Sequence, residues 1–343
     1  MGKTDSSRRS FLQAAGGLAA VAAAGSTAGC LDAVPFIGGG GQLAAVPEDS
    51  SAIMYANVDT VREDEGVQTV TNAYLSARSE SEWYDGPEDY EEALDEFEDD
   101  ADLDPEGLHE LVAFAEYGGD YGLVNNDYTA AIMEADWEID DVIDSLEESN
   151  GVEYDEDEHS GQPFYEPEED YASFAGVLSD DRIVVGQEDA VEDAIDADQG
   201  EDDGIDDELS GAYSDTRSAA VQYASVMPDP GEYDNVPETY GYGEEEVDLG
   251  VLEDVTTVAG SVYAEGDTRG IAVTMAADDE DAASDLADVT EGVLAYAEEN
   301  TYNETAVDLI GDVEVSEDGT DVTVSFEKSV GELEDLIDEN MGQ

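Results

Sequence analysis

The sequence predicts an α+β fold of two related halves, each with antiparallel hairpins that form a sheet packed by amphipathic helices. Three observations lead to this prediction. Runs rich in Val, Ile, Tyr and Ala have the length of strands and are bounded by Gly, Asn and Asp. Between them lie segments whose apolar residues recur three and four positions apart, as in helices. The order of these segments before residue 210 is also similar to the order after it.

In the first half, we expect strands, helices and two hairpins before an acidic stretch at 198–208. The expected strands are 51–58, 111–117 and 128–135, and the expected helices are 61–77, 90–99, 139–148 and 188–196. Residues 139–148 give the clearest helix, because Ile139, Val142, Ile143 and Leu146 fall on one face. A short helical turn should follow Pro105, and the hairpins should turn at 160–161 and 179–181.

The second half is expected to repeat this pattern in a simpler form. Its expected strands are 219–226, 258–263, 270–276, 313–316 and 321–326, and its expected helices are 280–299 and 330–339. Asp318-Gly319 is a strong hairpin signal between the last two strands. We therefore predict a tandem repeat of 44–210 and 211–343, with chance similarity of two α+β segments as the alternative.

The charge of the chain excludes several classes of function. Of 343 residues, 93 are Asp or Glu and nine are Lys or Arg, so the formal net charge is −84. Binding of duplex nucleic acid needs clustered Lys and Arg and is excluded. One cysteine cannot form an intramolecular disulfide, and a zinc site built from several His and Cys ligands is not expected.

The same charge indicates adaptation to high salt. Acidic residues are spread along the whole chain, 41% of the residues are hydrophobic, and Lys3 and Lys328 are the only lysines. In dilute salt such a surface repels itself, whereas at about 1 M salt the Debye length is near 3 Å and the repulsion is largely screened. We expect a folded, halophilic protein rather than a disordered one.

The N-terminus resembles a twin-arginine export signal that ends in a lipobox. Arg8, Arg9, Phe11 and Leu12 precede an uncharged Ala/Gly-rich run, which ends at Cys30. This resemblance implies a signal over 1–29, lipidation of Cys30 and a flexible Gly-rich stalk over 30–43. The expected location is the outer face of the cytoplasmic membrane, with the membrane contacted through the lipid on Cys30. An uncleaved anchor, or a simple signal peptide with an incidental cysteine, is the alternative.

Three segments of the body carry a family resemblance. They are the Tyr55-Ala56 strand that follows 46–49, the hairpin at 178–186, and the helix that starts at 188–190. Together they resemble a group of uncharacterised haloarchaeal lipoproteins exported by the twin-arginine route. The resemblance implies repeated α+β units of unknown function and provides no catalytic residues.

The sequence contains no recognisable catalytic motif. There is no Gly-x-Ser-x-Gly, and a phosphate-binding loop would need a lysine that the body offers only at Lys328. His109 and His159 each lie among carboxylates. Either could act with an Asp as a base, but a solvated histidine in an acidic loop is the expected environment.

One acidic cluster suggests calcium, and no other cofactor is expected. Asp100, Asp102 and Asp104 occupy the first three ligand positions of a calcium loop. Pro105 stands where such a loop needs glycine, and Leu111 where it needs glutamate. Diffuse condensation of cations on the acidic surface is the alternative.

Two features suggest surface contacts. Tyr233, Tyr240 and Tyr242 lie in a Pro/Gly/Glu-rich stretch, 229–246, where tyrosines would offer contact area to an unknown surface protein or a glycan. A cover on the core or a flexible loop is the alternative for this stretch. Asn303 begins the sequon Asn-Glu-Thr and is a possible glycosylation site.

These observations favour a lipid-anchored, salt-adapted cell-surface protein with a binding, scaffold or envelope role and no catalytic site. The first alternative is a surface hydrolase that uses paired carboxylates. The second is the ligand-binding component of an importer. Such components are built mostly from βαβ units with parallel strands, whereas this sequence predicts hairpins.

Overall fold

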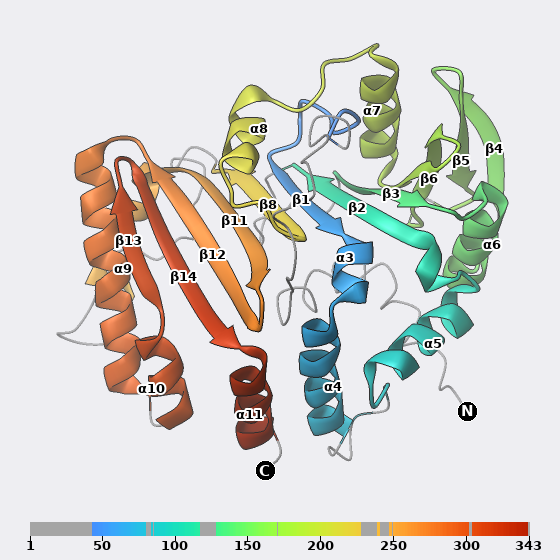
Figure 1. Ribbon diagram of the computed structural model, residues 1–343. Coiled ribbons are helices and arrows are strands. Elements are labelled where there is room, and N and C mark those ends of the chain that lie inside the picture. The colour runs from blue at the N-terminus through green and yellow to red at the C-terminus, as the bar shows by residue number, and fades with distance from the viewer. Residues whose placement is uncertain are drawn as a thin grey trace.

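Twelve strands form one antiparallel sheet that runs across the whole molecule (Figure 1). The computed structural model describes residues 43–79, 84, 86–116, 128–169, 171–227, 239–240, 247–248, 250–301 and 304–341. The strand order within these residues is β13-β14-β12-β11-β8-β1-β2-β3-β7-β6-β5-β4. Helices lie on both faces and at one end of the sheet, so the predicted α+β class is confirmed.

The strands agree with the expected segments to within a few residues. Those of the first half are β1 Ala52–Asn57, β2 Leu108–Ala115, β3 Thr129–Ala135, β4 Tyr154–His159, β5 Gln162–Pro167, β6 Phe174–Ser179 and β7 Arg182–Gly186. Those of the second half are β8 Val221–Val226, β11 Val255–Glu265, β12 Thr268–Ala277, β13 Glu314–Asp318 and β14 Asp321–Ser329. A separate pair, β9 Thr239–Tyr240 and β10 Val247–Asp248, lies outside the large sheet.

The helices depart from the prediction in three places. They are α3 Val58–Glu63, α4 Glu65–Ser79, α5 Tyr90–Ala101, α6 Ile139–Asn150, α7 Glu188–Gln199, α8 Asp207–Ser214, α9 Glu280–Asn300, α10 Glu304–Gly311 and α11 Val330–Met341, with 3-10 turns at Pro105–Gly107 and Gly250–Asp254. The single helix expected over 61–77 is two helices, because the Asp64 side chain accepts the backbone N–H groups of Gly66 and Val67 and starts α4 there. Helices α8 and α10 were not predicted.

The two halves meet at the centre of the sheet. Strands β1 and β8 pair antiparallel, with Ala52 opposite Ser225 and Ala56 opposite Val221. The sequence predicted a separate sheet for each half. Instead, the two halves share one continuous sheet. Outward from this pair, the order is β1-β2-β3-β7-β6 on one side and β8-β11-β12-β14-β13 on the other. The first side continues with β5 and β4.

Side chains alternate between two faces of the sheet. On the α7 face, α7, α8 and residues 43–46 cover a core that includes Val184, Ile195 and Leu209, none of which is exposed. Gly176 of β6 lies under Ile195, and a Cβ there would come within 2.7 Å of Ile195 Cδ1. The opposite face packs against α6 and α9. One row on it comprises Val177, Ile183, Met133, Leu111, Ala56, Val221, Val262, Ile271 and Phe326.

A buried ion pair also joins the two halves. Arg269 of β12 donates to Asp64 at 2.7 Å, and the side chains are 7% and 9% exposed. Helix α4 of the first half lies beside α11, the last helix of the chain (Figure 1).

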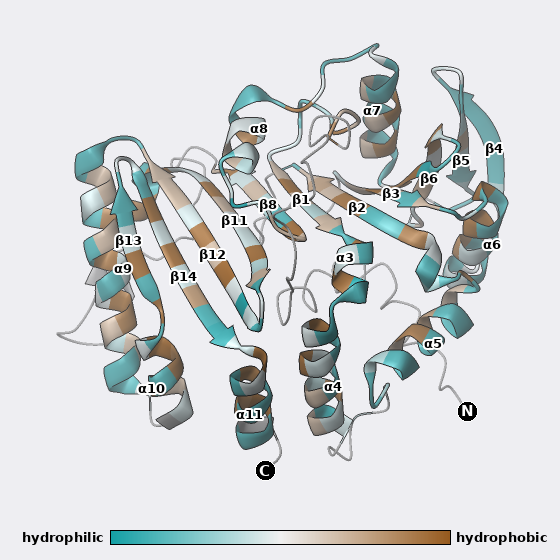
Figure 2. Ribbon diagram, in the orientation of Figure 1, coloured by the Kyte–Doolittle hydropathy of each residue, from teal (hydrophilic) through white to brown (hydrophobic). Residues whose placement is uncertain are grey.

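The outermost strands of the sheet, β4 and β13, are hydrophilic (Figure 2). Within the described residues, none of the helices combines the length and the apolar character needed to cross a bilayer.

Candidate functional site

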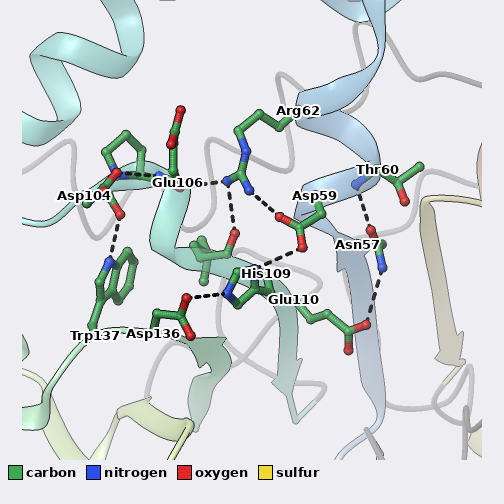
Figure 3. A network of polar contacts seen from close by, with 12 residues as sticks. Asn57, Asp59, Thr60, Arg62, Asp104, Glu106, His109, Glu110, Asp136 and Trp137 are labelled. Carbon is green, nitrogen blue, oxygen red and sulfur yellow. Dashed lines mark hydrogen bonds and ion pairs between the residues drawn. The ribbon is translucent and has the colours of Figure 1, made fainter.

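A network of polar side chains connects α3 with the ends of β2 and β3 (Figure 3). Asn57 ends β1 and begins α3, because its side chain accepts the backbone N–H of Thr60 at 2.8 Å. Asp59 and Arg62 follow one turn apart on α3 and form an ion pair. The cap therefore directs both charged side chains toward the start of β2.

His109 of β2 lies between two carboxylates. Its Nδ1 is 3.0 Å from Asp59 Oδ2, and its Nε2 is 3.3 Å from Asp136 Oδ2. Partial burial lowers the pKa of His109, but hydrogen bonds and charges from Asp59 and Asp136 outweigh that effect and raise it above the ordinary value. Both ring nitrogens lie within 3.3 Å of a carboxylate oxygen, so neither faces an open position from which it could take a proton from a substrate.

Arg62 connects this ion pair to the backbone. Its Nη1 donates to the carbonyl oxygens of Pro105 at 2.8 Å and Leu108 at 3.2 Å, while Nη2 binds Asp59. The guanidinium thus joins α3 to the 3-10 turn and the first residue of β2. Three protein oxygens occupy its two terminal nitrogens, which is the arrangement of a cation that holds the fold together.

Two glutamates lie beside the network on the α7 face. Glu110 of β2 is directly opposite Glu134 of β3 and accepts hydrogen bonds from Tyr55 Oη at 3.0 Å and Asn57 Nδ2 at 3.3 Å. Burial, followed by the charges of Glu110 and Asp181, raises the pKa of Glu134. A carboxyl group with a raised pKa beside a second carboxylate is a feature that the acid–base pair of a hydrolase also has.

The second histidine has the same kind of environment. His159, the last residue of β4, has Nδ1 3.3 Å from Glu192 Oε1 and Nε2 3.0 Å from Asp196 Oδ1. Asp196 also accepts from Ser160 Oγ at 2.5 Å. The prediction that each histidine lies solvated in an acidic loop is wrong. Each belongs to a strand and contacts two carboxylates from other segments of the chain.

Every Lys and Arg of the described chain contacts another side chain. Arg78 lies over the ring of Tyr84, with 4.8 Å between Cζ and the ring centroid. The other contacts are Arg62 with Asp59, Arg182 with Asp198, Arg217 with Glu265, Arg269 with Asp64, and Lys328 with Asp312. Within this part of the protein, no basic side chain remains without such a partner to hold an anionic ligand.

The aspartates predicted to bind calcium lie at the end of α5 and at the start of the next turn. Asp102 ends α5 in the left-handed conformation, with φ at 53°, and its N–H donates to Glu98 O. Asp104 caps the following 3-10 turn by accepting the N–H of Glu106 at 2.8 Å. Asp100 lies in the last turn of α5. Among the described residues, no group of three or more His, Cys, Asp or Glu side chains is arranged to hold a metal ion.

Most other predicted site residues lie outside the described residues. These are Arg8, Arg9, Phe11, Leu12, Cys30, Tyr233, Tyr242 and Asn303. Tyr240 belongs to β9, opposite Val247 of β10. The export, lipidation, glycosylation and tyrosine-contact predictions therefore stay predictions.

The residues around the two histidines were not singled out from the sequence. Asp59, Asp136, Glu192 and Asp196 are separated from their histidine by 27 to 50 positions, and they resemble dozens of other acidic residues. The usable signal was the scarcity of cations. In a chain with so few basic groups, each histidine is expected to attract carboxylates.

Comparisons with known proteins show a distant structural likeness. No known family and no curated protein matches the chain. Three solved structures of a protein named TP0453 are similar, in crystal forms III, I and IV. Their TM-scores are 0.45, 0.40 and 0.45, and their sequence identities are 8%, 9% and 10%. The three alignments cover 87%, 87% and 86% of this chain and 97%, 96% and 95% of the TP0453 chain. No residue role is carried over from this likeness.

Proposed function

We propose that this chain is a lipid-anchored, salt-adapted protein of the outer cell surface that binds a partner or supports the envelope without catalysis. The observation that supports the absence of catalysis is the position of carboxylates around the two imidazole rings. Each has both ring nitrogens within 3.3 Å of a carboxylate oxygen. A general base or a nucleophile-activating histidine needs one free nitrogen.

The anchored part of the proposal rests on the N-terminal sequence. The signal at 1–29, the lipid on Cys30 and the stalk at 30–43 would place the body outside the membrane, as in the haloarchaeal lipoproteins that the chain resembles. A glycan on Asn303 would be consistent with this location. The net charge of −84 supports a habitat of molar salt.

We also propose that the halves 44–210 and 211–343 descend from one repeated unit. The support is the strand order. When the additional hairpin β4–β5 of the first half is left out, both sides of the β1–β8 pair follow the order 1-2-3-5-4 outward, with a helix between the third and fourth of these strands. Such a coincidence of order, direction and helix placement is expected from duplication. Superposition of the two halves tests it.

Replacement of Cys30 by Ser tests the anchor. The variant should leave the membrane fraction for the medium, because about 0.8 kcal/mol per buried CH₂ of the lipid is lost. Lipid attachment is checked by the mass of the N-terminal peptide. A Ser26→Ala variant keeps the lipidated thiol and serves as the control. Unchanged retention of Cys30→Ser in the membrane fraction contradicts the proposal.

A surface hydrolase is the second candidate, and the Glu110–Glu134 pair is the observation in its favour. Purified protein would be incubated in molar potassium chloride with polysaccharides and peptides from the native envelope. Products that form with the wild type and disappear with Glu134→Gln would replace the non-catalytic proposal. Equal amounts of product, or none, from the wild type and from Glu134→Gln would support the non-catalytic proposal.

A further inference from the structure

An open groove lies beside the outermost strand of the second half. It is formed by α9, α10 and β13 and encloses about 270 Å³. Leu294, Ile310, Val313 and Val315 line it, and Glu291 and Glu298 of α9 also border it. The apolar side chains are half-buried, so they retain surface that a ligand would cover.

The corresponding place in the first half is filled by the chain itself. Beyond β6, strand β5 pairs through Phe164 opposite Gly176 and Tyr165 opposite Ala175. Tyr165 belongs to the same buried cluster as Val142 and Leu146 of α6. A strand at the edge and an aromatic side chain against the helix thus complete that side of the first half.

The second half has no such completion within the described residues. Strand β13 pairs with β14 on one side and is the last strand of the sheet on the other. A strand edge of this kind presents backbone N–H and C=O groups for pairing. The groove therefore lies next to an edge that has room for the equivalent of β5.

The charges beside the groove select the partner. Glu291 and Glu298 are exposed and lie two turns apart on α9, and their side chains form no ion pair or hydrogen bond with the described residues. The three cations of the second half, Arg217, Arg269 and Lys328, are engaged elsewhere. Basic side chains of a partner would complement these two carboxylates, and contact pairs are less affected by salt than distant ones.

We infer that this groove and the β13 edge bind an extended segment of a basic partner polypeptide. The segment pairs with β13 as β5 pairs with β6, and it inserts one large apolar side chain between α9 and α10. Basic residues two positions to either side of that side chain lie on the same face and reach Glu291 and Glu298. This inference rests on the proposed binding function and names the chemistry of its partner.

A synthetic peptide tests the inference with the purified full-length protein in molar potassium chloride. The probe is the blocked peptide Thr-Lys-Thr-Phe-Thr-Lys-Thr, whose Phe and Lys side chains share one face when extended. Titration calorimetry should show saturable binding, and the amide resonances of Val313 and Val315 should shift. The Glu291→Lys/Glu298→Lys variant should weaken binding by about tenfold or more.

Matched controls separate docking from general charge attraction. Asp281→Lys/Asp285→Lys makes the same change of charge on α9, outside the groove lining, and should leave the affinity within about twofold. A probe with Gly in place of Phe, and one with N-methyl groups on the residues that face β13, should each lose binding. Thermal unfolding of the variants confirms that they fold.

Three results would overturn the inference. They are the absence of saturable binding, equal weakening by both pairs of substitutions, and self-association through this edge that Glu291→Lys/Glu298→Lys abolishes. The last would identify a second copy as the occupant. Because the titration needs no membrane, its failure is distinguishable from failure of the Cys30→Ser experiment, which tests the anchor alone.

Discussion

The two halves of the sheet share a strand order but are covered differently. In the first half, α7 follows β7 and packs Val191 and Ile195 onto the sheet. In the second half, α11 follows β14 but packs against α4 of the first half. The same sheet face there carries Thr274, Thr323 and Ser325, which are only half-buried.

The difference shows how one strand order tolerates two solutions. Apolar side chains on the first half require a helix to remove them from water. Hydroxyl side chains on the second half tolerate partial exposure to water, and two of them, Thr274 and Thr323, form a hydrogen bond of 2.9 Å with each other. Because this face needs no covering helix, α11 packs against α4 and thereby joins the two halves.

The largest expected effect comes from breaking the buried link between the halves. Arg269→Met removes the cationic partner of Asp64, a carboxylate with 9% exposure that keeps only its backbone N–H donors, and we expect a loss of about 3–5 kcal/mol in the free energy of unfolding. Urea unfolding in molar potassium chloride measures it. The control, Arg217→Met, removes the same charge from a pair whose side chains are 40% and 67% exposed, and should cost less than about 1 kcal/mol. Equal losses would contradict the role of burial.

The next effect tests the covered face against the open one. Ile195→Ala removes a fully buried side chain of α7 and should cost about 2–5 kcal/mol through lost burial and the cavity left behind. Ser325→Ala, on the same face of the second half, should change stability by no more than about 0.5 kcal/mol. Calorimetric unfolding measures both, and a comparable loss for Ser325→Ala would show that its face is covered.

A smaller effect distinguishes the corresponding helices α6 and α9. The Asp279 side chain accepts the N–H of Ala282 at 2.9 Å and caps α9, whereas Glu138 precedes α6 without such a bond. Asp279→Ala should therefore destabilise the protein by about 1 kcal/mol. Glu138→Ala should have almost no effect. The midpoints of urea unfolding compare them, and a larger loss for Glu138→Ala would refute this assignment of the caps.

The smallest effect depends on pH. Since the folded-state pKa of His109 is raised, its stabilising contribution is complete below the unfolded value of about 6.5 and is lost as pH rises through the folded value. The stability advantage of wild type over His109→Gln should shrink accordingly, by less than about 1 kcal/mol, because the side chain is 31% exposed. Unfolding curves from pH 5 to pH 9 follow it. An advantage that grows with pH would reverse the assigned sign.

Local patterns predicted most helices and strands but not their interruptions. Apolar spacing located α6, and the Asp318-Gly319 turn located the β13–β14 hairpin. The break at Asp64 was missed because its carboxylate caps α4 while binding Arg269. Helix α8 was missed because acidic composition concealed its apolar positions, although Leu209 and Tyr213 are buried.

The candidate site was harder to predict than the fold. His109 and His159 were recognised as lying among carboxylates, but the carboxylates that contact them come from other elements. In a chain with 93 acidic residues, proximity in sequence does not distinguish one carboxylate from another. Only strand register and helix packing decide which ones meet an imidazole.

The sequence by itself determined the charge, the α+β class and the order of segments, because composition and local periodicity contain them. The tertiary structure decided that β1 and β8 join the halves into one sheet. It also brought Arg269 to Asp64 across 205 positions and placed an open groove beside β13. These outcomes depend on contacts between segments far apart in the chain, and local patterns carry little information about such contacts.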